Sequence, residues 1–229
     1  MRSVKSYHDR RDAGKILAAH VQEQIGTPDD AVVLALPRGG VPVGFEVARA
    51  LGAQFDVFVV RKLGAPGFEE FAIGAIATGG FQVLNDQAIA EHGISKKDIA
   101  EIAEREAGEL RRREELYRAD RPPVSLSDRV VILVDDGLAT GFTMRAAIAA
   151  VRACGPRQMI VAVPVGAVDT CAEIEHEVST LICPLQPDPF RAVGLWYHDF
   201  GQTTDDEVRE CLTAATLNYE APHKAHSES

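Results

Sequence analysis

Two adjacent carboxylates, Asp135 and Asp136, follow the aliphatic run of residues 130–134 and precede a short loop that contains glycine and threonine. An uninterrupted aliphatic run is typical of a strand buried on both faces of a parallel sheet. Open α/β sheets bind their ligands at the carboxyl ends of such strands. Carboxylates in that place can accept hydrogen bonds from neighbouring sugar hydroxyls or hold a hydrated Mg²⁺.

The loop leads into residues 146–151, whose apolar spacing predicts a helix. Unpaired N–H groups and the positive end of the helix dipole make a helix start an anion site. Gly141 allows close approach of the backbone, and the hydroxyls of Thr140 and Thr143 suit phosphate oxygens. A diol beside a phosphate describes a ribose 5-phosphate. The alternative, an ordinary corner with Thr143 as N-cap, does not account for two adjacent acids.

A second strand–turn–helix unit begins with the apolar run 31–36 and continues into helical spacing over 43–51. Between them lie Arg38, Gly39 and Gly40. A guanidinium can bind phosphate with two parallel hydrogen bonds where the backbone comes close, so these residues are a candidate pyrophosphate loop. The alternative is a tight turn with an exposed arginine.

A third candidate is the pair Arg61 and Lys62, which ends a strand predicted over 55–60. A glycine-rich loop, residues 63–70, follows and could act as a lid. Cations at the carboxyl end of a strand suit a polyphosphate. A solvated, charged turn is the alternative, because loops are polar by default.

Residues 187–200 gather aromatic side chains, including the single tryptophan of the chain. Trp196 and Tyr197, with Asp199 beside them, could stack on a flat heteroaromatic ring and bind its polar edge. An aromatic satellite core is the other interpretation of this segment.

The remaining pattern predicts one α/β domain over residues 1–220, with a mostly parallel sheet between helices. A long charged helix at about 95–120 is an insertion, and a small polar tail, 221–229, is expected to be disordered. Further helices are predicted over 9–25, 85–93, 168–177 and 204–212, strands over 158–165 and 180–185, and a hairpin over 71–78 and 81–84.

Composition excludes several classes of protein. The net charge of −10 over 229 residues argues against a nucleic-acid partner. The four cysteines show no C-x-x-C spacing, which favours a reduced, cytoplasmic setting without a metal cluster. No apolar stretch reaches the roughly 18 residues that a membrane helix needs, and the first eleven residues do not look like a signal peptide.

The segment Val134-Asp135-Asp136-Gly137-Leu138-Ala139-Thr140-Gly141-Phe142-Thr143 resembles the 5-phosphoribosyl-1-pyrophosphate (PRPP) signature of type I phosphoribosyltransferases. The resemblance extends over nearly the whole chain and is closest to bacterial members whose acceptor is unassigned. It implies a parallel sheet with a small hood, here about residues 185–203. It also implies Mg²⁺-dependent transfer from PRPP to a nitrogenous acceptor, usually a nucleobase as in nucleotide salvage, with release of pyrophosphate. A homodimer is common in the family.

The resemblance also implies roles for the candidate residues. Asp135 and Asp136 match the acids that hold the ribose hydroxyls and, through water or ligand, the Mg²⁺. The matches to the other subsites are the 5′-phosphate loop (Ala139, Thr140, Gly141, Phe142, Thr143), the pyrophosphate loop (Arg38, Gly39, Gly40), the Arg61-Lys62 pair before the catalytic loop, and a base-binding hood strand (Trp196, Tyr197, Asp199).

One position departs from the family pattern. Ala139 stands where hypoxanthine-guanine enzymes have an aspartate placed to take a proton from the base. The nucleophile then needs no base there, or Glu69 or Glu70 supplies it. A third option is a non-catalytic regulator that binds PRPP or a nucleotide, although the acidic composition weighs against the nucleic-acid-binding surface that such regulators often carry.

Overall fold

The computed structural model describes residues 6–118 and 121–227, and its centre is a five-stranded parallel sheet. The strands lie in the order β2 (Gln54–Val57), β1 (Ala31–Ala35), β6 (Val130–Val134), β7 (Gln158–Ala162) and β8 (Thr180–Ile182). Each pairs in parallel with its neighbours. The predicted α/β fold is confirmed.

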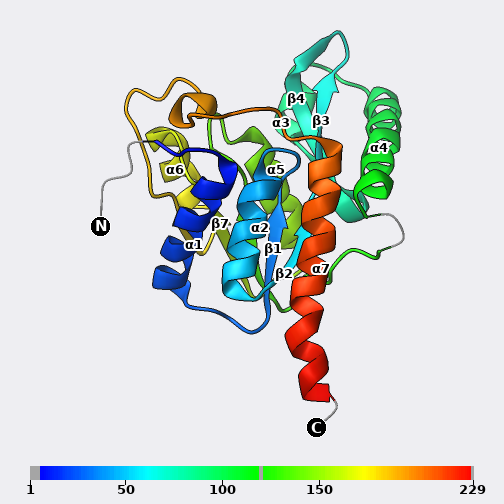
Figure 1. The fold of residues 1–229 in the computed structure, drawn as a ribbon. Coiled ribbons are helices and arrows are strands. Elements are labelled where there is room, and N and C mark those ends of the chain that lie inside the picture. Colours follow the sequence, from blue (N-terminus) through cyan, green and yellow to red (C-terminus); the bar gives the residue numbers. More distant parts are fainter. Residues whose placement is uncertain (1–5, 119–120, 228–229) are drawn as a thin grey trace.

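Helices cover both faces of this sheet, because its strands bury alternate side chains on opposite sides. Val33 belongs to the core beneath α1 (Arg10–Ile25), α2 (Gly40–Leu51) and α7 (Asp205–Ser227). Val32 belongs to the core beneath α5 (Phe142–Ala153) and α6 (Val168–Glu175). Figure 1 shows α1, α2 and α7 in front of the sheet, with α5 and α6 behind them.

The strand order changes direction between β1 and β6. The chain passes from β1 to β2 on one side and from β6 to β7 on the other. Ala35 and Val134, the last residues of β1 and β6, are register partners. In doubly wound folds the loops that leave two such strands diverge toward opposite faces, which creates a ligand crevice at their carboxyl ends.

A second, antiparallel sheet of three strands stands beside the carboxyl edge, formed by β3 (Val60–Ala65), β4 (Phe68–Ala77) and β5 (Phe81–Leu84), with the turn η1 (Thr78–Gly80). The strand predicted over 55–60 is present as β2, but it ends at Val57, where the chain leaves the parallel sheet, and Val60 already belongs to β3. The predicted loop 63–70 is wrong, since Pro66 and Gly67 form the turn of a hairpin. Figure 1 shows this sheet with α3 (Asp86–Glu91) and α4 (Lys96–Arg118).

The helical insertion is present as α4, which begins with a capping box: the N–H of Asp98 donates to Ser95 Oγ at 3.2 Å, and the N–H of Ser95 donates to Asp98 Oδ2 at 3.3 Å. Its last two predicted residues, 119 and 120, lie outside the described residues. Among the residues that the structure describes, no helix is long and apolar enough to cross a membrane.

The segment between β8 and α7 contains the short turn η2 (Val193–Trp196) and runs, in orange, across the upper left of Figure 1 to the start of α7. Helix α7 extends to Ser227, so it runs into the tail 221–229, whose disorder stays a prediction.

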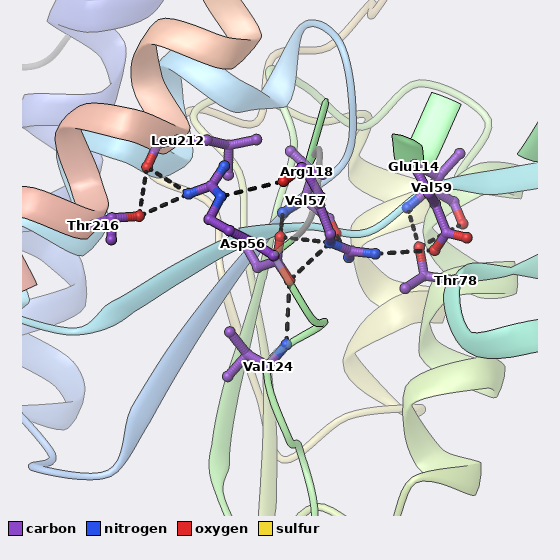
Figure 2. Close-up of polar contacts among 10 residues, drawn as sticks. Asp56, Val57, Val59, Thr78, Glu114, Arg118, Val124, Leu212 and Thr216 are labelled. Carbon is purple, nitrogen blue, oxygen red and sulfur yellow. Dashed lines mark hydrogen bonds and ion pairs between the residues drawn. The ribbon is translucent and has the colours of Figure 1, made fainter. Parts of the chain in front are cut away.

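A buried ion pair ties the edge strand β2 to α4 (Figure 2). Arg118 Nε lies 2.9 Å from Asp56 Oδ1, and both side chains are nearly inaccessible to solvent. Arg118 also donates to the carbonyl of Val57 at 2.5 Å and to Glu114 at 3.0 Å, while the N–H of Val124 donates to Asp56. Each charge is therefore satisfied by several partners, as buried charges require.

Removing one partner of this pair should destabilise the fold. We expect Asp56→Asn to lower the free energy of unfolding by about 3–5 kcal/mol, because the Arg118 charge stays buried without its counter-ion. Asp30→Asn, in the exposed pair with Arg157, is the matched control and should unfold near the wild-type urea concentration. Equal urea midpoints for the two variants would contradict this expectation.

Candidate functional site

The two predicted phosphate and ribose loops meet in the crevice between β1 and β6. A Cβ atom added to Gly39 would lie 2.1 Å from Asp136 Oδ2, and one added to Gly40 would lie 2.8 Å from the Cα of Asp135. Any side chain at either position would collide with the acids. The glycines therefore let the candidate pyrophosphate loop approach the candidate ribose acids. The Pro37–Arg38 peptide bond in this loop is cis.

The two acids are buried side by side. Asp135 Oδ1 accepts the backbone N–H of Asp136 at 2.8 Å. Burial raises the pKa of the Asp135 carboxyl well above its usual range, and the charge of Asp136 raises it further. Burial also raises the pKa of Asp136, while the guanidinium of Arg10 acts in the opposite direction. The crevice thus favours a ligand that supplies hydroxyl donors or positive charge.

Arg10, the first residue of α1, contacts this site although the sequence analysis did not select it. Its Nε donates to Asp136 Oδ2 at 2.8 Å and its Nη1 to the carbonyl of Gly201 at 2.5 Å. Its guanidinium carbon lies 3.9 Å from the centre of the Phe200 ring. Its local sequence resembles any helix start, so no local signal could have identified it.

The candidate 5′-phosphate loop presents a helix start with unpaired donors. Gly141 is the N-cap of α5 at φ 71°, and no side chain caps the helix. This rules out the alternative in which Thr143 is the N-cap. In the part of the chain that the structure describes, the backbone N–H groups of residues 139–144 donate no hydrogen bond. These are the groups that bind anions at helix starts.

The carbonyl groups of this loop are bound elsewhere. Thr170 Oγ1 donates to the carbonyl of Ala139 at 2.7 Å, and Arg145 Nη1 donates to that of Thr140 at 2.9 Å. Arg145 is in turn paired with Glu173 on α6. The two carbonyl groups hold the loop in place through their bonds to Thr170 and Arg145. The backbone N–H groups of the loop are then available to a ligand. Phe142 and Thr143 are exposed at the same helix start.

Arg38 is half-buried, and its Nη1 lies 3.8 Å from Asp205 Oδ1 at the start of α7. The hydroxyl of Tyr117 on α4 donates to the same Asp205 oxygen at 2.9 Å. Burial, together with this hydrogen bond, raises the pKa of Tyr117 to about 12, so the phenol remains a donor at neutral pH. Asp205 and Tyr117, which the sequence analysis did not select, thus connect Arg38 to α7 and α4.

Arg61 and Lys62 lie in β3 of the second sheet and not at the end of a parallel strand. The guanidinium of Arg61 donates to Glu106 Oε2 on α4 at 2.7 and 3.0 Å. Lys62 is half-buried in the same strand. The placement of Arg61 is therefore set by α4, a helix that no sequence pattern connects with it. Glu70 and Glu69 lie in β4, but their side chains are outside the described part of the chain.

The predicted base-binding residues lie in the hood and are partly used to build it. Tyr197 is buried and packs between Tyr7 and Phe200, with ring centroids 5.6 and 5.0 Å away. Its hydroxyl donates to the carbonyl of Asp136 at 2.5 Å. Trp196 packs against the same aromatic cluster, while Asp199 is exposed. The satellite-core interpretation therefore describes Tyr197, although its hydroxyl also holds the main chain of Asp136.

The donor set fits a Mg²⁺ held mainly by a ligand. Among the described residues, no group of three or more histidine, cysteine, aspartate or glutamate side chains could enclose a metal. Proteins often bind Mg²⁺ through one or two carboxylates together with substrate phosphates and water. Asp135 and Asp136 could supply the carboxylates, directly or through water.

Comparison with known proteins defines the class. Residues 3–196 match the family model of the phosphoribosyl transferase domain, so the chain belongs to that family. The resemblance that its PRPP signature indicated is confirmed, as are the expected parallel sheet and flanking helices.

Two curated relatives, from two strains of Mycobacterium tuberculosis, carry the provisional name phosphoribosyl transferase. Each is 42% identical over 216 residues, which is 94% of this chain and 48% of the relative. The chain therefore spans about half the length of these relatives.

Solved structures show the same fold. The crystal structure of TT1426 from Thermus thermophilus is 42% identical, with a TM-score of 0.82 over 91% of this chain and 98% of that one. A Neisseria gonorrhoeae protein solved with bound ppGpp is 14% identical, with a TM-score of 0.50 over 93% of this chain and 98% of its own, and shares the fold alone.

The close contact at Gly39 can be tested directly. Gly39→Ala should weaken Mg²⁺-PRPP binding by about tenfold or more, because the new Cβ must displace the Asp136 carboxylate; overpacking should also lower stability by about 1–3 kcal/mol. Gly108→Ala on exposed α4 meets no atom within 4 Å and is the matched control. Isothermal titration calorimetry measures the affinity, and unchanged binding by Gly39→Ala would refute the contact.

Proposed function

We propose that the chain binds PRPP with Mg²⁺ and transfers its phosphoribosyl group to a nitrogenous small molecule, releasing pyrophosphate. The observation that supports this most is the convergence of three features in one crevice. These are the uncapped start of α5, the acids Asp135 and Asp136, and the loop of Arg38, Gly39 and Gly40. The acids touch the glycine loop and lead directly into the start of α5, which supports the assignment of these features to the ribose, pyrophosphate and 5′-phosphate of one PRPP molecule.

In this proposal the protein works by positioning and electrostatics. The unpaired N–H groups at the start of α5 hold the 5′-phosphate, with the hydroxyls of Thr140 and Thr143 beside them. Asp135 and Asp136 accept the ribose hydroxyls and stabilise the positive charge that develops on the ring as pyrophosphate departs. Arg38 faces the departing pyrophosphate. When bound, Mg²⁺ would neutralise the negative charge of this pyrophosphate.

A role in binding the departing pyrophosphate is less well supported for Arg61 and Lys62 than for Arg38. Arg61 is paired with Glu106, so it must exchange that partner before it can bind pyrophosphate. The roles assigned to both residues therefore remain predictions, as do those of Trp196, Tyr197 and Asp199 in acceptor binding. Magnesium dependence, a role in nucleotide salvage, a homodimer and a cytoplasmic location are predictions of the same kind.

The second candidate is a non-catalytic protein that binds PRPP or a nucleotide. Two observations favour it: Ala139 has no carboxylate to accept a proton from a base, and the ring of Tyr197 is buried between Tyr7 and Phe200. The Neisseria gonorrhoeae protein, which shares the fold, was crystallised with the nucleotide ppGpp bound. Pyrophosphate release from PRPP and Mg²⁺, screened against nucleobases and amines, separates the candidates, because only the transferase releases pyrophosphate.

Asp136→Asn tests both candidates at the ribose subsite. We expect the PRPP dissociation constant to rise about ten- to hundredfold, since a charged acceptor of the ribose hydroxyls is lost. Calorimetric titration with Mg²⁺-PRPP measures the change. Asp30→Asn, which alters an exposed acid paired with Arg157, should bind like the wild type. Unaltered affinity in Asp136→Asn would remove the ribose assignment.

A further inference from the structure

Arg10 joins three parts of the molecule at one guanidinium. Its Nε bonds the Asp136 carboxylate, its Nη1 bonds the carbonyl of Gly201, and its face covers the Phe200 ring. The side chain is only 12% exposed. Helix α1 is thereby connected to the hood and to the candidate ribose acid.

The hydrogen bond from Arg10 holds one carboxylate oxygen of Asp136 and leaves the other available to a ligand. Arg10 bonds Oδ2, and no other side chain of the described residues donates to this carboxylate. A carboxylate has about four lone-pair sites on two oxygens, so Oδ1 keeps its capacity to accept a ribose hydroxyl. The same oxygen, Oδ2, also lies closest to Gly39, where an added Cβ would be 2.1 Å from it and 3.2 Å from Oδ1. Rotation of the carboxylate is therefore restricted by the arginine and by the pyrophosphate loop.

The main chain of the same acid is held as well, because Tyr197 donates to the carbonyl of Asp136. Arginine suits the side-chain contact because its planar fork offers donors in fixed directions and an apolar face for stacking. A lysine ammonium carries its three donors on one nitrogen and has no planar face, so it cannot reproduce this set of contacts.

We propose that Arg10 is a positioning residue for the phosphoribosyl site: it orients the Asp136 carboxylate so that Oδ1 receives the ribose hydroxyl of PRPP. This inference rests on the proposed function, since it assumes that PRPP binds in the crevice. The opposite role is that Arg10 blocks the crevice and must leave before PRPP enters. The two roles predict opposite changes in affinity when Arg10 is replaced.

The experiment measures the dissociation constant of Mg²⁺-PRPP and the thermal unfolding midpoint for the wild type, Arg10→Met, Arg10→Lys and Arg11→Met. Arg11 is the matched control because it neighbours Arg10 on α1 but pairs with Glu46, away from the acids. We expect Arg10→Met to weaken binding about tenfold or more, Arg10→Lys to weaken it less, and Arg11→Met to leave it unchanged.

A thermodynamic cycle separates positioning from general support of the fold. In the Asp136→Asn background, Arg10→Met should cause little further loss of affinity, because its effect passes through the carboxylate that is already gone. A purely structural arginine would weaken both backgrounds equally, and that result would overturn the proposal. If Arg10→Met does not fold, the Mg²⁺-PRPP affinity of Arg10→Lys tests the proposal instead. An affinity equal to that of the wild type would overturn it.

The outcomes also separate this inference from the proposed function. A wild-type chain that does not bind PRPP would overturn both. If the wild type binds PRPP and Arg10→Met binds it equally well, only the positioning role is overturned. If Arg10→Met binds PRPP more tightly, the positioning role is overturned and the blocking role is indicated.

Discussion

The close approach of Gly39 and Gly40 to Asp135 and Asp136 is the constraint on which the site depends. It exists because β1 and β6 are adjacent, parallel and in register, so that both strands end at the same level. Their following helices lie on opposite faces of the sheet, which opens the crevice above them. Without side chains on the two glycines, the backbone of one loop can touch the acids of the other.

This arrangement places buried negative charge where it is unfavourable without partners. Two adjacent carboxylates repel each other, and burial raises the pKa of both. The structure offsets this with the N–H of Asp136, the guanidinium of Arg10 and the nearby positive end of α5. Within the described residues, the N–H groups at the start of α5 donate no hydrogen bond, and the two carboxylates can accept further ones. A sugar phosphate complements both.

Much of this could be predicted from the sequence because it depends on local patterns. The aliphatic runs identified β1 and β6, and the helix predicted from residue 9 is α1, with Asp9 as its N-cap. The two glycine loops followed from the same patterns, since each comes directly after a buried strand.

What could not be predicted depends on tertiary contacts. Arg10 lies 126 residues from Asp136 in sequence, and Arg61 is 45 residues from Glu106. The break after Val57 was missed because the apolar run continues unchanged from one sheet into the next. The hood aromatics were ambiguous for a similar reason, as stacking on a ligand and stacking on Tyr7 need the same residue types.

The most direct measurement is a crystal structure of the chain with PRPP and Mg²⁺. We predict the 5′-phosphate within hydrogen-bond distance of the N–H groups at the start of α5, with the ribose hydroxyls on Asp135 and Asp136. PRPP bound outside the crevice, or bound there with its ribose turned away from both acids, would contradict this prediction.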